Sequence, residues 1–492
     1  IDLLIRFSDL EAHYTNNGLW PLNLIYNFGW NPGFWSLHAL NGSVNYIIIL
    51  FVLHFIFALF LLLGYKTRLF SVLVWLFTIS LHNRNLFVLQ AGDDLLRMIL
   101  FWGIFLPWGN YYSIDSKKIT RLKNNALANI GYLLLIASIY FFTFNLKNSA
   151  EWRNSGTAIY FALSLDQLRL PFFGDWLYQF PILMNILTHF VYWLEFVLPF
   201  LILWPSKNSK SRFIAFILIL ILQIGIGMTL YVGLFFLINI VSSIGLIPSI
   251  KFKFYRSRQK KNTFIFQKPF KQNYFLKISS NLIAVYVIII CIIINLSSVN
   301  WFNYQLKSEF TYSVNLFRLN QFWGMFSPKV LKNDGWFVYH GIDSLGQSWD
   351  LRMNKKNINY SKPKHIVRLY KNDRWRKLAE NMQNPKYNFL RPQFGKNILR
   401  LWNIENPKKN MVTLNLYFME KENLLNYQNT QIKKINLETA YHEAISNSNS
   451  EFGVDDLNLL IGDFKGDHKK LKNISKIKFS SIMKLLKSGS LL

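Results

Sequence analysis

The chain has 492 residues, 51% of them hydrophobic and 17% aromatic, with a formal net charge of +29 at pH 7. Its basic residues lie mainly in short loops between apolar runs, without the basic stripe or module of a nucleic-acid-binding protein, so we expect no nucleic-acid partner. Membrane lipid, with its anionic head groups, is the expected partner of those loops. The single cysteine, Cys291, excludes an internal disulfide and any cysteine-based metal site.

Long apolar runs predict an α-helical polytopic membrane bundle of about eight spans, because a helix needs about 20 apolar residues to cross the hydrocarbon core. The predicted spans are 43–63, 69–82, 94–108, 126–146, 181–204, 213–230, 232–249 and 278–298. The spans 69–82 and 94–108 are short for a crossing, and the last two before residue 250 form a hairpin divided near Tyr231–Gly233. Because the chain begins with Ile1 rather than Met, we expect that one more span is lost and that Ile1–Arg6 is its end.

The charges of the loops predict the orientation of the bundle. When the eight spans alternate, four segments rich in Lys or Arg fall on one side, namely Gly64–Arg68, Lys117–Lys123, Lys207–Arg212 and Lys251–Lys277. Such loops stay in the cytoplasm, so we expect a multi-pass protein of the cell membrane whose chain after residue 299 is extracytoplasmic. The alternation also places 10–42 and 147–180 outside, where Trp, Phe, Pro and Gly predict partly helical elements in the membrane interface.

The pattern changes after Trp301 and predicts a strand-rich α+β domain over 300–448, behind a transmembrane domain over 1–299. Alternating runs predict strands at Gly335–Gly341, Ser348–Met353 and Met411–Met419, with a turn at Asn333-Asp334-Gly335. We expect helices in 365–384 and 430–448. The polar segment 449–492 is expected to be a mobile tail.

Two ionisable residues are candidates for chemistry because of their depth in the bundle. Glu195 lies in the middle of a predicted span and must face a partner in the interior, either as part of a site or as a structural anchor between helices. Lys147 follows the span 126–146, where partial desolvation favours the neutral amine that a general base requires. The alternative for Lys147 is an interfacial lysine whose amine reaches the head groups.

Three further charged residues open the short span 94–108. Asp94 and Arg97 are three positions apart and can pair on one helix face. Together with Asp93 they are candidates for positioning a catalytic group, or else a helix-start carboxylate and an internal ion pair. The chain contains neither an HExxH site nor a dinucleotide fingerprint, and the spacing of its nine histidines suggests no ligand set, so we expect no metal.

Several segments in a specific order carry a family resemblance. They are LEAHYTNNGLWP (10–21), GYKTR (64–68), SLHNRN (80–85), GDDLLR (92–97), LPWGNYYSID (106–115), YFFTFNLKNSAEW (140–152), YWLEFVLP (192–199), QFWGMFSPKV (321–330) and NDGWFVYHG (333–341). In these segments the chain resembles the HTTM family, whose membrane domain is shared with the vitamin K-dependent gamma-glutamyl carboxylases. Those proteins also place a strand-rich domain after the last helix, on the lumenal or external side.

The resemblance implies a reaction. In the carboxylases a lysine at the outer membrane face deprotonates a reduced quinone, oxygen adds, and the resulting alkoxide removes a γ-proton from a peptide glutamate. Carbon dioxide then traps the carbanion. That lysine falls on Lys147 here, and Tyr140, Phe141 and Trp152 also match its motif. The resemblance therefore implies a reduced quinone as cofactor and an exported peptide or protein as partner.

The chain departs from the carboxylase pattern in three places, the first being that its single cysteine rules out the disulfide that joins the two halves of the carboxylases. Thr143 and Phe144 replace a small Ala-Gly pair, so the room beside the lysine is expected to be reduced. Where the carboxylases have a catalytic histidine, this chain has Asp93 and Asp94, and the nearest histidine is His82, about ten residues earlier.

Two functional hypotheses follow from the sequence. The first is a carboxylase-like enzyme with Lys147 as base and Glu195, Asp93 or Asp94 positioning it. The second is a non-enzymatic membrane factor for the maturation, export or immunity of a secreted protein. A transporter is less favoured, because the two halves of the bundle show no similarity to each other of the kind that inverted repeats have.

Overall fold

The computed structural model describes residues 1–110, 113–117, 125–205, 209–248, 274–302, 304, 306–428 and 430–441. The predicted tail 449–492 lies outside the described residues. Most residues of the predicted basic loops Lys117–Lys123 and Lys251–Lys277 also lie outside the described residues.

Every predicted apolar run contains a helix. The helices of the bundle are α4 (Val44–Leu63), α5 (Thr67–Arg84), α6 (Ala91–Phe105), α7 (Ala126–Leu146), α11 (Pro181–Leu203), α12 (Lys210–Thr229), α13 (Phe235–Ser243) and α15 (Tyr274–Leu296). Five of them are long and apolar enough to cross a membrane, over Val44–Leu63, Ala126–Leu146, Pro181–Leu203, Lys210–Thr229 and Lys277–Leu296. The predicted break in the run 213–249 is confirmed, because α12 ends at Thr229 and α13 begins at Phe235. The count of eight spans stays a prediction, since α5, α6 and α13 fall outside these five.

The helix α7 packs against α6, α11 and α15 at the centre of the bundle. Small residues permit this close packing: a Cβ atom at Gly131 of α7 would lie only 2.2 Å from the ring of Trp102 in α6. Buried apolar side chains such as Ile136 and Leu198 fill the space between the helices. α7 is therefore held on several sides, which fixes the place of the residue that follows its last turn.

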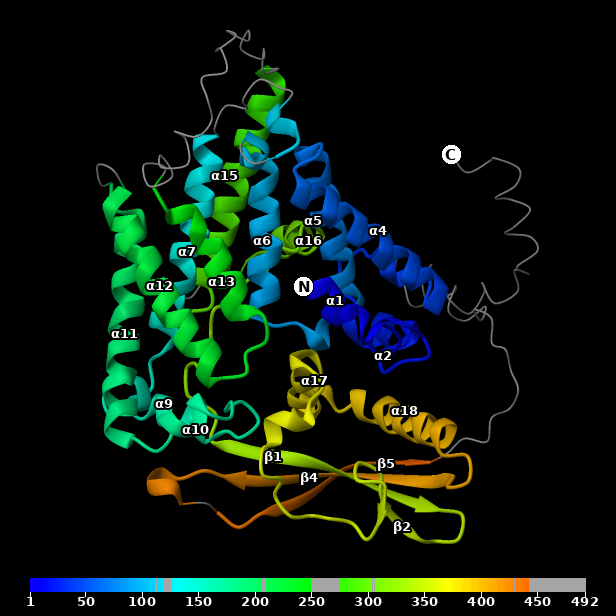
Figure 1. The fold of residues 1–492 in the computed structure, drawn as a ribbon. Coiled ribbons are helices and arrows are strands. Elements are labelled where there is room, and N and C mark those ends of the chain that lie inside the picture. The colour runs from blue at the N-terminus through cyan, green and yellow to red at the C-terminus, as the bar shows by residue number, and fades with distance from the viewer. Residues whose placement is uncertain are drawn as a thin grey trace, which may run out of the picture.

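Short helices connect the long ones at the end of the bundle nearest the sheet (Figure 1). They are α1 (Asp2–Phe7), α2 (Leu10–Tyr14), α3 (Leu22–Leu24), the π-helix Ile25–Gly29, α8 (Ala150–Arg153), α9 (Ala158–Ser164), α10 (Phe173–Leu177) and the 3-10 helices Leu37–Ala39 and Leu86–Val88. The prediction of partly helical segments in 10–42 and 147–180 is confirmed. Two further 3-10 helices, Trp108–Asn110 and Asp115–Lys117, follow α6.

The C-terminal part forms a five-stranded antiparallel sheet of order β3-β2-β1-β4-β5. Its elements are α16 (Ser308–Leu316), β1 (Asn333–Asp343), β2 (Ser348–Asp350), β3 (Lys355–Lys356), α17 (Asp373–Gln383), α18 (Leu390–Glu405), β4 (Met411–Glu422), β5 (Lys433–Tyr441) and the 3-10 helices Ile366–Leu369, Pro385–Tyr387 and Leu425–Tyr427. The helices α17 and α18 lie between the sheet and the bundle (Figure 1).

One apolar core joins the sheet to the bundle. Phe337 and Phe418 from the sheet, Phe394 from α18, and Trp20 and Phe87 from the bundle side belong to a single buried cluster. Because this cluster contains side chains from both parts of the chain, the strand-rich part is docked on the bundle rather than tethered to it.

Two secondary-structure predictions for the C-terminal part are wrong. The helix predicted in 430–448 is wrong over its described part, because Lys433–Tyr441 forms β5, which pairs with β4, while 442–448 lie outside the described residues. The predicted turn at Asn333-Asp334-Gly335 is instead the start of β1, opposite Glu422, Lys421 and Glu420. In both places the ladder of hydrogen bonds with β4 outweighs the local preference of the residues. The prediction for 365–384 is confirmed in its larger part by α17.

Candidate functional site

Lys147 and Glu195 form a buried ion pair between α7 and α11. The Lys147 Nζ lies 2.7 Å from both Oε1 and Oε2 of Glu195, and the side chains are only 4% and 8% exposed. Lys147 directly follows the last residue of α7, and Glu195 lies inside α11. Charges at this depth persist only when they are paired, so each residue supplies the partner that the other requires.

An aromatic ring closes the other side of the amine. The centroid of the Trp152 ring lies 3.9 Å from the Lys147 Nζ, within the range of a cation–π contact. The short helix α8 reverses the chain after α7 and brings Trp152 back over the amine. The indole N–H of Trp152 donates to the Phe326 carbonyl at 2.8 Å, and the Thr143 hydroxyl donates to the Trp323 carbonyl at 3.0 Å. The segment before β1 therefore caps the pair.

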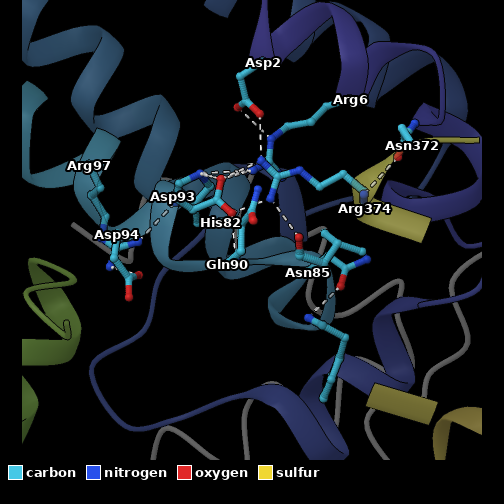
Figure 2. Close-up of polar contacts among 12 residues, drawn as sticks. Asp2, Arg6, His82, Asn85, Gln90, Asp93, Asp94, Arg97, Asn372 and Arg374 are labelled. Carbon is cyan, nitrogen blue, oxygen red and sulfur yellow. Dashed lines mark hydrogen bonds and ion pairs between the residues drawn. The ribbon is translucent and has the colours of Figure 1, made fainter. Parts of the chain in front are cut away.

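Asp93 belongs to a second buried cluster, shown in Figure 2. Its Oδ1 accepts from Arg6 at 2.6 Å and from Arg374 at 2.7 Å, and Arg374 also donates to its Oδ2. The Gln90 backbone N–H donates to the same Oδ2 at 2.8 Å and completes a capping box at the start of α6. Asp2 accepts from both arginines at 2.8 Å. The cluster thus links α1, α6 and α17.

His82 and Arg97 extend this cluster (Figure 2). The His82 Nδ1 lies 3.2 Å from Arg97 Nη1, and its Nε2 lies 3.7 Å from Asp93 Oδ1. Arg97 pairs with Asp94 at 2.8 Å, which is the ion pair that their spacing allows. Arg97 also donates to the carbonyls of Arg318 and Asn320, at 2.7 and 2.9 Å. His82, ten residues before the expected place in the sequence, therefore lies at the start of α6 in space.

The five candidate residues separate into two groups. Glu195 contacts Lys147, as the first hypothesis requires, whereas Asp93, Asp94 and Arg97 bond to other partners. Sequence reasoning missed Arg6 and Arg374. A buried carboxylate at position 93 signals that a cation must be near it, but its chain position does not show which cation that is.

Among the residues that the structure describes, one group has ligand atoms close enough to hold a metal ion. The ligand atoms of Asp2, His82 and Asp93 lie within 4.8 Å of one another. Arg6 and Arg374 already donate to both carboxylates, so a metal ion would have to displace two guanidinium groups. Burial alone would raise the pKa of Asp2, but these two arginines hold its pKa below the ordinary value. The expectation of no metal stays a prediction.

The surroundings of Lys147 are closed in this arrangement, and the Trp152 indole and the Glu195 carboxylate contact its amine. Neither of two pockets in the described part of the chain is lined by Lys147 or Glu195. Phe144, three residues before Lys147, packs against Tyr192 and Phe196 with ring centroids 4.6 and 5.0 Å apart. The side chain of Phe144 is therefore held between α7 and α11 by aromatic contacts of its own.

The chain was compared with protein-family models, curated proteins and solved structures. No protein-family model, curated protein or solved structure matches the chain.

Proposed function

We propose that this chain is an HTTM-like integral membrane protein that modifies an exported peptide or protein by carboxylase-like chemistry, with Lys147 as its base. One observation carries the proposal: an amine at the end of an apolar helix is buried against a single carboxylate, Glu195, at 2.7 Å. Perturbed ionisable groups of this kind are concentrated at functional sites. The motif that contains Lys147 supports the same assignment.

The proposed topology has eight spans, with α5, α6 and α13 added to the five long apolar helices. The basic loops then lie in the cytoplasm. Lys147, the short helices and the sheet lie together on the opposite side. An exported peptide would therefore reach the base from the side on which the sheet domain lies.

Glu195 has a chemical task in this proposal, beyond positioning. An ammonium group cannot accept a proton, so Lys147 must first transfer one to a Glu195 oxygen. In a dry environment this transfer replaces two buried charges with two neutral groups, which lowers the desolvation penalty. The free amine can then take a proton from an acidic group of the substrate. Trp152 stabilises the ammonium that forms, through the face of its ring.

The family resemblance implies a reduced quinone as the cofactor of this reaction. Access to Lys147 requires that Trp152 or the segment around Phe326 move away, because their hydrogen bond closes the site. Such an opening would admit substrate and then exclude water again.

The test is incorporation of labelled carbon dioxide into secreted peptides by membranes supplied with a reduced quinone. Wild type is expected to incorporate label, whereas Lys147→Ala and Lys147→Arg are expected to lose incorporation, because a guanidinium stays protonated. Product is expressed per amount of folded protein. The double variant Lys147→Met/Glu195→Gln serves as a control that keeps two neutral side chains in the pair. Equal incorporation of label by wild type and all variants would contradict the proposed enzymatic function.

A non-enzymatic membrane factor is the second candidate, and the closed surroundings of Lys147 favour it. The ion pair would then anchor α7 to α11 without chemistry. A specific exported protein should co-purify with the chain in that case. The same protein should also co-purify with the double variant, in which the pair is neutral.

A further inference from the structure

An open pocket of about 370 Å³ lies where the last turn of α12 meets the segment between α9 and α10. Its wall includes Leu170, Pro171, Phe172, Met228, Tyr231 and Arg368. Backbone hydrogen bonds join the three segments of the wall: the Leu170 N–H donates to the Thr229 carbonyl, and the Val367 N–H donates to the Asp166 carbonyl. The pocket therefore has a fixed frame, and its volume is in the range of small-molecule sites.

Apolar side chains continue from the pocket along the outside of α12. Ile217, Ile221 and Ile224 are exposed, and with Met228 they follow at helical spacing along one face of the helix. α12 is one of the five helices that are long and apolar enough to cross a membrane. Exposed apolar side chains on such a helix face acyl chains, so a hydrocarbon chain lying on this stripe ends at the pocket.

Phe172 lines the pocket, and further exposed aromatic side chains follow it in the chain. Phe172 is 82% exposed, and Phe173, Trp176 and Phe180 are exposed directly before α11 begins. Aromatic rings gather at the depth of the lipid head groups. Phe172 also has a φ of 69°, which a bulky residue rarely adopts. Strain of this kind persists where the surrounding structure imposes it, often at binding sites.

Arg368 provides the charge at this pocket. It is exposed on the 3-10 helix Ile366–Leu369, and it has no ion-pair partner among the residues that the structure describes. Asp175, which lies 4.0 Å from the neighbouring His365, is already bound to Arg169 at 2.8 Å. A guanidinium group binds phosphate oxygens through parallel N–H donors.

We propose that this pocket binds a diacyl phospholipid, with one acyl chain along the α12 stripe and the phosphate at Arg368. The stripe selects an apolar chain, the aromatic side chains set the depth, and the free guanidinium selects the phosphodiester. The site links the sheet domain to the membrane surface, because Arg368 belongs to the chain that follows β3. This proposal does not depend on the carboxylase-like function.

The test uses the full chain, purified in detergent, stripped of lipid and titrated with phosphatidylglycerol, with bound lipid counted by native mass spectrometry. Arg368→Gln is expected to weaken binding about fivefold, the effect of one basic residue near a lipid phosphate. Leu170→Trp fills the pocket and is expected to remove the bound lipid. The control Lys355→Gln removes an exposed charge on β3 and is expected to leave binding unchanged. Circular dichroism confirms that each variant is folded.

Three outcomes would overturn the proposal. The first is equal lipid binding by wild type, Arg368→Gln and Leu170→Trp. The second is displacement of the lipid by inorganic phosphate alone, which would assign Arg368 to a free anion. The third is displacement by an apolar peptide at a lower concentration than by added lipid, which would assign the pocket to a polypeptide.

Discussion

Arg374 in α17 donates to both carboxylate oxygens of Asp93 at the start of α6, although 281 positions separate the two residues in the chain. α17 shares a buried apolar cluster with the sheet, and α6 lies in the bundle, so this pair joins the two parts of the molecule. Both side chains are buried, and Arg6 adds a third charge to the contact. The sheet domain is therefore held in one orientation by a charged contact as well as by the apolar core.

The first prediction concerns this link. Arg374→Ala leaves Asp93 with one guanidinium fewer in a buried site, and breaking such a contact destabilises by about 3 kcal/mol. We expect a lower thermal midpoint in detergent and faster hydrogen exchange in α17. The matched control on the same helix is Lys377→Ala, which breaks a half-exposed pair with Glu380 and costs about 0.5 kcal/mol. Equal shifts for the two variants would contradict a structural role for Arg374.

The second prediction separates stability from chemistry at Lys147. Lys147→Met leaves the Glu195 carboxylate buried without its partner and is expected to destabilise the protein by about 3 kcal/mol. The double variant Lys147→Met/Glu195→Gln removes both charges and is expected to regain most of that stability. Thermal unfolding in detergent, arranged as a double-mutant cycle, measures the coupling. Additive effects of the two substitutions would contradict the buried pair.

The helices of the bundle could be predicted from the sequence because each is marked by a continuous apolar run and by the residues at its own ends. The apolar run 43–63 ends at Gly64, whose φ of 66° closes α4 in the way that a glycine favours. The strand β5 was missed for the opposite reason. Its Lys, Leu, Glu and Ala residues favour a helix, and only the pairing of Leu414 with Ala440 and its neighbours on β4 makes it a strand.

The candidate site likewise contains residues that could be predicted from their local sequence and one partner that could not. Glu195 and Lys147 could be predicted separately, because each is an ionisable residue in or beside an apolar run. The depth of Glu195 in its span also indicated that it needs a partner. Arg374 could not be predicted as a partner of Asp93, because it lies in an ordinary polar helix whose position depends on the docking of the whole sheet domain.

The third prediction tests the close packing of α6 and α7. An alanine at Gly131 would place its Cβ 2.2 Å from the Trp102 ring, so one helix must shift. Overpacking of this kind costs about 2 kcal/mol. Gly225→Ala in α12 is the matched control, because no atom lies within 4 Å of its added Cβ. We expect the thermal midpoint to fall for Gly131→Ala only, and a fall of equal size for Gly225→Ala would contradict this packing.

The fourth prediction rests on a buried carboxyl group between the bundle and the sheet. Burial, together with the neighbouring Asp166 carboxylate, raises the pKa of Asp334 to about 6. The backbone N–H groups of Asp166 and Gln167 donate to Asp334, and Lys421 lies opposite it on β4. Burial and the neighbouring Lys362 lower the pKa of Lys421 to about 8, so this lysine keeps its charge at the acidic pH values where Asp334 titrates.

Between about pH 4 and pH 6 the folded state keeps a proton on Asp334 that the unfolded state releases, so stability from this group falls as pH rises through that window. A pKa raised by about two units corresponds to roughly 3 kcal/mol. We expect Asp334→Asn, which cannot ionise, to gain stability relative to wild type at pH 7 compared with pH 4.5. Thermal midpoints of both proteins in detergent at the two pH values measure this difference.

Glu405→Gln, at the exposed end of α18, is the control, and its thermal midpoint relative to wild type should be the same at both pH values. A relative gain for Asp334→Asn at the lower pH instead would show that Asp334 is charged in the folded protein, because a carboxylate held by Lys421 would stabilise it above pH 4.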